Sequence, residues 1–178
     1  MIVEALRKRL VYRQWKLTVY TQGFRIPGGQ VIERLIVGAN LKPVIIVPIT
    51  DEGKLVMVRQ YRYAAMKYIL EFPGGLVNRG ESPIEVAKRE LEEETGYTSD
   101  TFIKVADHIW FDPAMLRISF AVWVALHCCK MQKAPKMDFD EVISESCLID
   151  PGKLEEIEDS KTLAAISLAR KYLDYRSG

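Results

Sequence analysis

A glycine turn followed by glutamates at helical spacing sets the strictest requirements on how this sequence folds. The turn contains Gly74 and Gly75, and the glutamates are Glu90, Glu93 and Glu94. At about 100° of rotation per residue, the three carboxylates project from one side of a helix. Like charges three and four residues apart repel, and acids in a last helical turn oppose the negative end of the helix dipole. The arrangement therefore requires positive charge from elsewhere.

Local signals predict the limits of the helix that carries these glutamates. Ser82 is suited to the N-cap position, Pro83 to the first turn, and Glu85 to the second position of a capping box. Gly96 is typical of the residue that ends a helix. The sequence therefore predicts a helix from about Pro83 to Thr95.

Carboxylates without other donor types favour a hard divalent cation. Magnesium binds through a few carboxylates while it keeps waters and substrate phosphates, so we expect Mg²⁺, with Mn²⁺ as the alternative. The chain has two histidines, His108 and His127, which disfavours a histidine-rich zinc site. The simpler alternative is a solvated acidic helix face. The adjacent glycine turn favours the metal site.

The segment from Gly75 to Tyr97 fills the pattern of the Nudix box. In that pattern, Gly is followed after five residues by Glu, then after seven by Arg-Glu-aliphatic-any-Glu-Glu-any-Gly-aliphatic. On these residues the chain resembles the Nudix hydrolase family, and it departs only at Tyr97, where an aliphatic residue is usual. The resemblance implies an α+β fold, a Nudix-type α/β/α sandwich with a mixed sheet. It also implies an enzyme, a Nudix diphosphatase that hydrolyses phosphoanhydride bonds.

The resemblance also implies a metal-ligand set. Glu90 and Glu94 match the principal ligands, Glu93 an additional ligand, and the carbonyl of Gly74 a backbone ligand. Arg89 matches a position that orients a ligand carboxylate, and it is counted with the catalytic residues. For Gly74, the alternative is a residue that only makes a turn.

A second stretch, from Arg59 to Ala65, resembles the segment that precedes the box in ADP-ribose pyrophosphatases and other nucleoside-diphosphate-sugar hydrolases. In that group the arginine matching Arg62 contacts the substrate's diphosphate, and guanidinium is suited to bidentate phosphate contacts. Arg59 is either a further substrate contact or a charge at a strand end. Glu71 also fits the group and is assigned to the substrate-binding set, as a peripheral metal or water contact.

The substrate assignment depends on Pro113, which lies sixteen positions after Tyr97. A proline at this spacing marks the ADP-ribose subgroup, although Asp112-Pro113-Ala114 replaces the usual Ser-Pro-Gly. We therefore expect hydrolysis of ADP-ribose to a nucleoside monophosphate and a sugar phosphate. The alternatives are GDP-mannose or a broad range of nucleoside-diphosphate sugars, a nucleoside triphosphate, and a non-catalytic module that senses nucleotide sugars.

In the resembled group the general base often comes from a loop that follows the long strands. The matching segment here is Asp138-Phe139-Asp140-Glu141, and we expect Glu141 to be the base, with Asp140 as the second choice. The alternative is an acidic cluster that only solvates the loop. If the loop does not supply the base, Glu93 is the first candidate within the box.

The chain length of 178 residues suits one domain with a small extension. β-rich runs at Val11–Tyr20, Phe24–Ile26 and Val31–Val37, separated by Gly23 and by Pro27-Gly28-Gly29, predict an antiparallel extension over residues 1–40. Residues 41–178 then form the hydrolase domain. The resemblance implies that the extension mediates a homodimer and contributes to the substrate site.

Further runs predict the elements of the hydrolase domain. Strands are expected at Val44–Thr50, Lys54–Arg59, Tyr68–Phe72, Phe102–Trp110, Arg117–Cys129 and Val142–Ile149. A short helix is expected at Asp150-Pro151, and a longer one over Ser160–Tyr175.

Charge and cysteine content exclude several functional classes. The formal net charge of +1 gives no overall attraction to nucleic acid or to an anionic membrane. The N-terminus lacks an apolar signal core, and no run approaches the roughly 18 apolar residues of a membrane helix. The three cysteines have no zinc-type spacing and fit reduced strand positions. We therefore expect a cytoplasmic protein with a small-molecule substrate.

Overall fold

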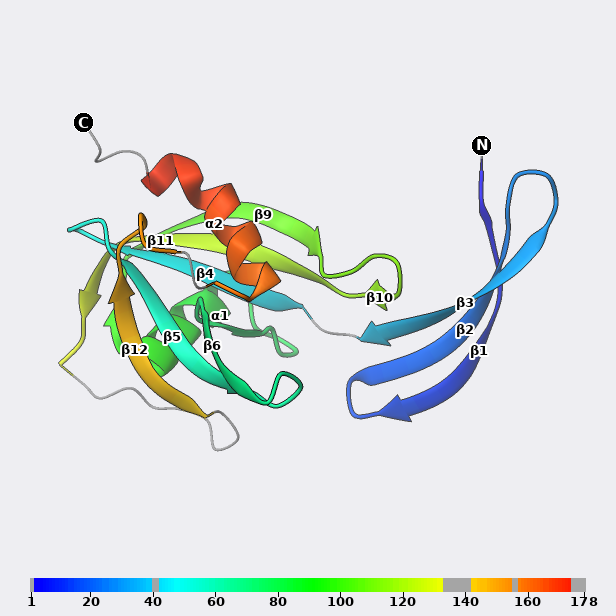
Figure 1. Ribbon diagram of the computed structural model, residues 1–178, viewed down its shortest axis with the longest axis horizontal. Helices are drawn as coiled ribbons and strands as arrows, with labels where there is room; N and C mark the ends of the chain where they lie inside the picture. The colour runs from blue at the N-terminus through cyan, green and yellow to red at the C-terminus, as the bar shows by residue number, and fades with distance from the viewer. Residues whose placement is uncertain (1, 40–41, 133–141, 155–156, 174–178) are drawn as a thin grey trace. The chain divides into compact units, whose positions relative to one another are not determined.

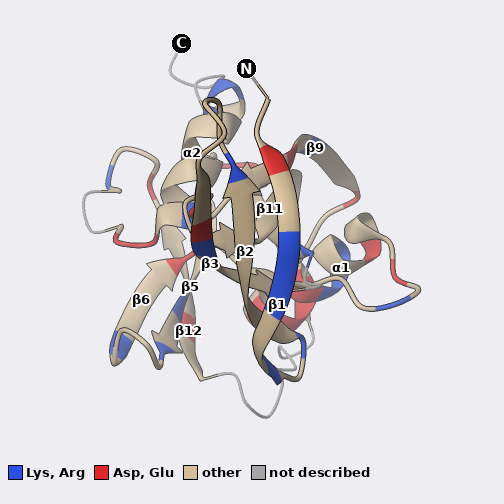
Figure 2. Ribbon diagram, turned by 90° about the vertical axis from the view of Figure 1, so that its right-hand side faces the viewer, with Lys and Arg blue, Asp and Glu red and all other residues tan. Residues whose placement is uncertain are grey.

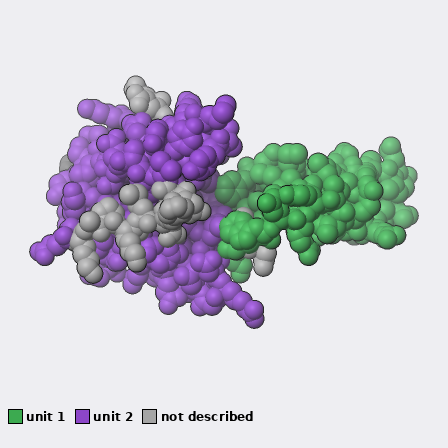
Figure 3. Space-filling model, turned by 90° about the horizontal axis from the view of Figure 1, so that it is seen from below, with its two compact units in different colours: residues 1–42, 109–119 green, residues 43–108, 120–178 purple. Residues whose placement is uncertain are grey.

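The structure is a computed structural model that describes residues 2–39, 42–132, 142–154 and 157–173. The chain divides into two compact units, which Figure 3 shows in different colours. Unit 1 contains Met1–Lys42 and Ile109–Ser119, and unit 2 contains Pro43–His108 and Phe120–Gly178. Unit 1 therefore includes a segment that is distant in sequence from the N-terminal residues.

Unit 1 is a four-stranded sheet in the order β1-β2-β3-β10 (Figure 1). Its strands are β1 (Glu4–Gln14), β2 (Leu17–Arg25), β3 (Val31–Ala39) and β10 (Leu116–Arg117). The first three strands pair antiparallel, as predicted, and β10 joins β3 in parallel. The predicted turn after β2 contains Gly28 at φ +98° and Gly29 at φ +85°, where glycine has no steric cost.

The first turn of unit 1 differs from the prediction. The sequence predicts one strand over Val11–Tyr20, but β1 ends at Gln14 and β2 begins at Leu17. Trp15 adopts φ +50° in the turn between them, which is uncommon for a residue with a side chain. Gly23, expected to separate two strands, lies inside β2. The prediction was wrong here because Trp15 and Lys16, which form the turn, are a bulky and a charged residue and do not signal a turn in the sequence.

Charged residues are distributed unevenly between the units. Figure 2 shows Lys and Arg along β1, which carries Arg7, Lys8, Arg9 and Arg13 and is exposed along almost its whole length. Acidic residues outnumber basic ones in unit 2. The near-zero net charge of the chain therefore combines a basic unit 1 with an acidic unit 2.

Unit 2 contains an eight-stranded sheet with the main order β12-β5-β4-β11-β8. In addition, β6 pairs with β5, β7 with β4, and β9 with β11. The strands are β4 (Pro43–Thr50), β5 (Leu55–Arg62), β6 (Lys67–Glu71), β7 (Gly74–Leu76), β8 (Tyr97–Thr98), β9 (Thr101–Trp110), β11 (Ser119–Lys130) and β12 (Ile143–Ile149). Strands β4 and β11 run parallel, whereas β5 is antiparallel to β4 and to β12, so the sheet is mixed.

Helices cover both faces of this sheet. They are α1 (Pro83–Glu90), its π-helical continuation η1 (Leu91–Thr95), and α2 (Ser160–Leu173). Figure 1 shows α1 and α2 on opposite faces. Val86 and Ala87 of α1 are fully buried in a core with Val44 and Ile46 of β4, and apolar burial of this kind holds the layers together. The predicted α/β/α sandwich is confirmed.

The start of α1 follows its local sequence signals. Ser82 Oγ accepts a hydrogen bond from Glu85 N, and the Glu85 carboxylate accepts one from Ser82 N, so the predicted capping box is present. Hydrogen bonds from the Ser82 side chain and backbone lower the pKa of Glu85. The helix ends at Thr95 and Gly96, as predicted, with Gly96 at φ +72°, but its last turn is π-helical, which the sequence did not predict. Such turns often occur at functional sites.

The segment after β12 is a turn and not the predicted short helix. Lys153 N donates to the carbonyl of Asp150 at 2.8 Å, and Gly152 N donates to the Asp150 carboxylate at 3.1 Å. A side-chain acceptor two residues upstream favours a turn over a helix, which explains why the prediction was wrong. In the described part of the chain, no helix has the length and apolar character needed to cross a membrane.

Candidate active site

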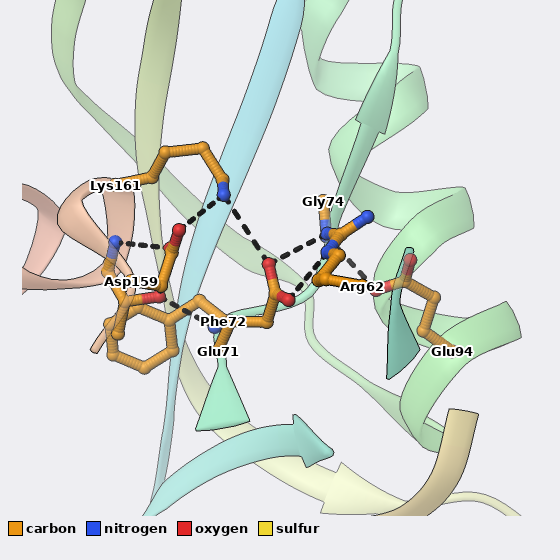
Figure 4. Close-up of polar contacts among 8 residues, drawn as sticks. Arg62, Glu71, Phe72, Gly74, Glu94, Asp159 and Lys161 are labelled. Atoms are coloured by element: carbon orange, nitrogen blue, oxygen red, sulfur yellow. Dashed lines mark hydrogen bonds and ion pairs between the residues drawn. The ribbon is translucent and has the colours of Figure 1, made fainter. Parts of the chain in front are cut away.

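Two predicted metal ligands contact the glycine turn of unit 2. Glu94 Oε2 accepts a hydrogen bond from Gly74 N at 3.0 Å (Figure 4). The Glu90 carboxylate packs so closely on Gly75 that an added Cβ would lie 1.8 Å from Glu90 Oε1. Glu90 and Glu94 are only 7% and 3% exposed. The glycines therefore allow two buried carboxylates to approach the backbone at the start of β7.

Arg89 supplies positive charge to the acidic helix. Its Nη1 lies 2.8 Å from Glu93 Oε2, its Nη2 2.9 Å from Glu90 Oε1, and its Nε 3.7 Å from Glu81 Oε1. Burial alone would lower the pKa of Arg89, but the hydrogen bond to Glu93 and the charges of the three glutamates outweigh it and raise the pKa. The helix thus carries part of the compensation that its acids require.

The donor chemistry of the turn fits a hard cation. Glu90 and Glu94 present buried oxygen donors beside the backbone of Gly74, and buried carboxylates need a positive partner. Among the residues that the structure describes, no group of three or more His, Cys, Asp or Glu converges closely enough to hold a metal. Glu90 and Glu93 instead pair with Arg89. The residue types of the turn therefore fit a divalent cation. In this structure Arg89, and not a cation, neutralises Glu90 and Glu93.

An ion pair between a half-exposed arginine and a buried glutamate lies beside the same turn. Arg62 Nε donates to Glu71 Oε1 and Arg62 Nη2 to Glu71 Oε2, both at 2.7 Å, and Glu71 is 1% exposed. Burial alone would lower the pKa of Arg62, but the hydrogen bond and charge of Glu71, and then the charges of Glu94 and Asp159, raise it. Glu71 therefore occupies the side-on edge of the guanidinium, which is formed by Nε and Nη2. A phosphate would meet the end-on edge, formed by Nη1 and Nη2.

Arg59 and Pro113 make contacts of their own, and the two predicted bases are not described. Arg59 pairs with Glu145 of β12 at 3.4 Å, with both side chains largely exposed. Pro113 belongs to unit 1, where it lines a groove of about 600 Å³ with Tyr20 and Trp110. Glu141 and Asp140, the predicted bases, lie outside the described residues.

Three residues before and at the start of α2 join the site without having been predicted. Lys161 Nζ lies 3.5 Å from Glu71 Oε2 and 2.5 Å from Asp159 Oδ1, and Thr162 Oγ1 accepts from Phe72 N at 3.2 Å. Asp159 Oδ2 accepts from Thr162 N at 2.9 Å, as an N-cap residue does. This cap was readable in the sequence Asp159-Ser160-Lys161-Thr162, but its contact with β6 was not.

Burial disfavours the thiolate form of two of the three cysteines. All three are free thiols, and burial raises the pKa of Cys128 to about 12. Burial also raises the pKa of Cys147. A reactive cysteine requires a lowered pKa, so neither Cys128 nor Cys147 is suited to act as a nucleophile.

The chain is similar to several known proteins. A NUDIX domain model matches residues 40–168. The ADP-ribose pyrophosphatase of Bacillus subtilis (strain 168) is 32% identical over 168 residues, which cover 92% of this chain and 90% of the relative. The methanol dehydrogenase activator of Bacillus methanolicus is 36% identical over 149 residues, which cover 79% of this chain and 78% of the relative. A crystal structure of an ADP compounds hydrolase matches with a TM-score of 0.83 at 23% identity, covering 97% of this chain and 95% of that one, and this likeness shows the fold.

We predict different defects for alanine at the two glycines. In Gly75→Ala, the new Cβ meets the Glu90 side chain, so the carboxylate must move, and affinity for Mg²⁺ or Mn²⁺ should fall by roughly tenfold or more. In Gly74→Ala, the Cβ meets the Val44 carbonyl oxygen at 2.3 Å, so the β4–β7 pairing must shift and the thermal midpoint should fall more. Calorimetry measures both. Equal metal affinity in wild type and Gly75→Ala would contradict the assignment of Glu90.

Proposed function

The chain belongs to the Nudix hydrolase family, whose chemistry is hydrolysis of diphosphate bonds, and from this premise we propose that it cleaves nucleoside-diphosphate sugars, with ADP-ribose as the leading substrate. The products are a nucleoside monophosphate and a sugar phosphate. One structural observation carries the proposal: Arg62, held by buried Glu71, lies beside the turn where Gly74 contacts Glu94. The similarity to an ADP-ribose pyrophosphatase along most of both chains supports this substrate class.

In the proposed site, the residues divide the work of holding cation and substrate. Glu90, Glu94, Glu93 and the carbonyl of Gly74 would hold Mg²⁺ or Mn²⁺. When bound, the cation supplies neutralisation of phosphoryl charge and activation of water. The end-on edge of Arg62 binds the diphosphate, because Glu71 fixes the other edge.

Arg89 keeps the glutamates oriented through its three ion pairs. Substrate contacts by Arg59 and Pro113 stay predictions from the sequence.

The general base also stays a prediction. Glu141 is our first assignment, Asp140 the second, and Glu93 the candidate within the box. Glu93 Oε2 accepts a hydrogen bond from Arg89 at 2.8 Å, so only its other carboxylate oxygen could accept a proton while this pair persists. A base from outside the helix would not be shared with Arg89 and the metal in this way.

The alternatives differ in what they require of the site. GDP-mannose and other nucleotide sugars share the diphosphate that Arg62 would hold, so they remain competing substrates. A triphosphate hydrolase would not need to bind a sugar. A non-catalytic sensor would be marked by loss of box glutamates, and this sequence keeps all of them. The similarity to a methanol dehydrogenase activator favours including a partner-activation assay. A cytoplasmic location stays a prediction from the sequence.

We further propose that residues 1–40 mediate a homodimer. Unit 1 exposes large apolar side chains on its strands and at the first turn, among them Leu10, Tyr12, Trp15 and Leu35. Exposed apolar groups at this density mark interaction surfaces. Light scattering at micromolar concentration should give twice the chain mass of 20.4 kDa. A mass of one chain would contradict the dimer.

A product-resolved screen tests the substrate class. With magnesium present, ADP-ribose, GDP-mannose, UDP-glucose, NADH, diadenosine polyphosphates and triphosphates are compared. We expect the highest kcat/KM for ADP-ribose, with AMP and ribose 5-phosphate as products. Preference for a triphosphate, with release of phosphate or pyrophosphate, would contradict the proposal.

Glu94→Gln tests the metal assignment. Loss of one ligand charge should lower kcat by roughly 100-fold or more, since charge stabilisation by a catalytic metal contributes several kcal/mol. The thermal midpoint should not fall, because the amide keeps an acceptor for Gly74 N and relieves repulsion among the acids. Glu92→Gln is the matched control, since Glu92 bonds Thr98 away from the turn. Unchanged turnover of Glu94→Gln at saturating magnesium would remove the assignment.

A further inference from the structure

The unpredicted residues at the start of α2 converge on one buried carboxylate. Glu71 accepts two hydrogen bonds from Arg62, and Lys161 Nζ lies 3.5 Å from Glu71 Oε2. Lys161 is itself only 19% exposed at its side chain. A buried carboxylate needs compensating charge and a fixed geometry, and here two cations from different elements supply both.

The position of Lys161 is not explained by helix stability. Lys161 lies in the first turn of α2, where a positive charge opposes the positive end of the helix dipole. The Asp159 carboxylate offsets this by accepting from Lys161 Nζ and by capping Thr162 N. Burial alone would raise the pKa of Asp159, but the bonds and charge of Lys161 and the bonds of Thr162 lower it. The lysine is therefore kept at an unfavourable place by its acidic partners.

The same helix start also fixes the backbone next to Glu71. Thr162 Oγ1 accepts from Phe72 N at 3.2 Å, and Thr162 is 1% exposed. Two residues later, Gly74 N donates to Glu94. Figure 4 shows the resulting series of contacts from α2 through Glu71 to Arg62 on one side and through Phe72 to Gly74 on the other. The start of α2 thus contacts Glu71, which holds Arg62, and Phe72, which lies two residues before Gly74.

We propose that Lys161 is a positioning residue, which holds the Glu71 carboxylate so that the end-on edge of Arg62 stays directed at the substrate diphosphate. This inference rests on the proposed function for its last link, the contact between Arg62 and diphosphate. Its first link, from Lys161 through Glu71 to Arg62, concerns the protein alone. The two links can therefore be tested separately.

The first experiment needs no substrate. In isotope-labelled protein, the Arg62 Hε resonance, assigned by its loss in Arg62→Lys, should exchange slowly with solvent because Nε is bonded to Glu71. Lys161→Met should accelerate this exchange by roughly tenfold, and Lys161→Arg should largely restore it. Lys67→Met is the matched control, since Lys67 pairs with Glu158 just before α2 but is half exposed. An unchanged Arg62 Hε exchange rate in Lys161→Met overturns the inference, whatever the substrate is.

The second experiment measures binding of the α,β-methylene analogue of ADP-ribose by calorimetry. Lys161→Met should weaken binding by about tenfold, and KM for ADP-ribose should rise while kcat changes by less than about twofold. In an Arg62→Ala background, Lys161→Met should cause no further loss. A full additional loss in that background, or an equal loss in Lys67→Met, overturns the positioning role. If Arg62 Hε exchange accelerates but the affinity of Lys161→Met is normal, Lys161 holds Arg62 and the proposed diphosphate clamp is wrong.

Discussion

The fold of unit 2 has to compensate several carboxylates that are almost fully removed from solvent. Glu71, Glu90 and Glu94 are at most 7% exposed, and all three lie around the corner between β6 and β7. Ionised carboxylates at such depth are costly unless cations and hydrogen bonds compensate them. Arg62 and Lys161 compensate Glu71, Arg89 compensates Glu90, and the backbone of Gly74 bonds Glu94. A divalent cation completes this compensation in our account and connects it to diphosphate chemistry.

The elements of unit 2 are arranged so that this compensation is possible. The mixed sheet brings β5 beside β6 and β4 beside β7, and Arg62 at the end of β5 bonds Glu71, three residues before Gly74. The capping box and the apolar face of α1 set the start of the acidic helix. On the opposite face, α2 begins with a cap whose neighbours contact Glu71 and Phe72. Both helices therefore act on the same short segment of backbone.

The sequence predicted those parts of the structure that depend on local signals. Ser82, Glu85 and Gly96 define their helix ends through neighbouring backbone groups, and the box pattern identifies the fold. It did not predict the turn at Trp15, where a non-glycine residue adopts a left-handed backbone conformation. It also did not predict the π-helical last turn of the acidic helix. The contact of Lys161 with Glu71 joins residues ninety positions apart and depends on how α2 packs, which local spacing does not encode. The whole-chain charge likewise concealed the contrast between the two units.

The most direct test is a crystal structure with Mg²⁺ and the α,β-methylene analogue of ADP-ribose. We expect Mg²⁺ bound by Glu90, Glu94 and the carbonyl of Gly74, with Arg89 displaced from Glu90 toward Glu81 and Glu93. We also expect the diphosphate on Nη1 and Nη2 of Arg62, while Nε stays bonded to Glu71. A cation bound away from this turn, or a diphosphate that does not contact Arg62, would contradict the proposed site.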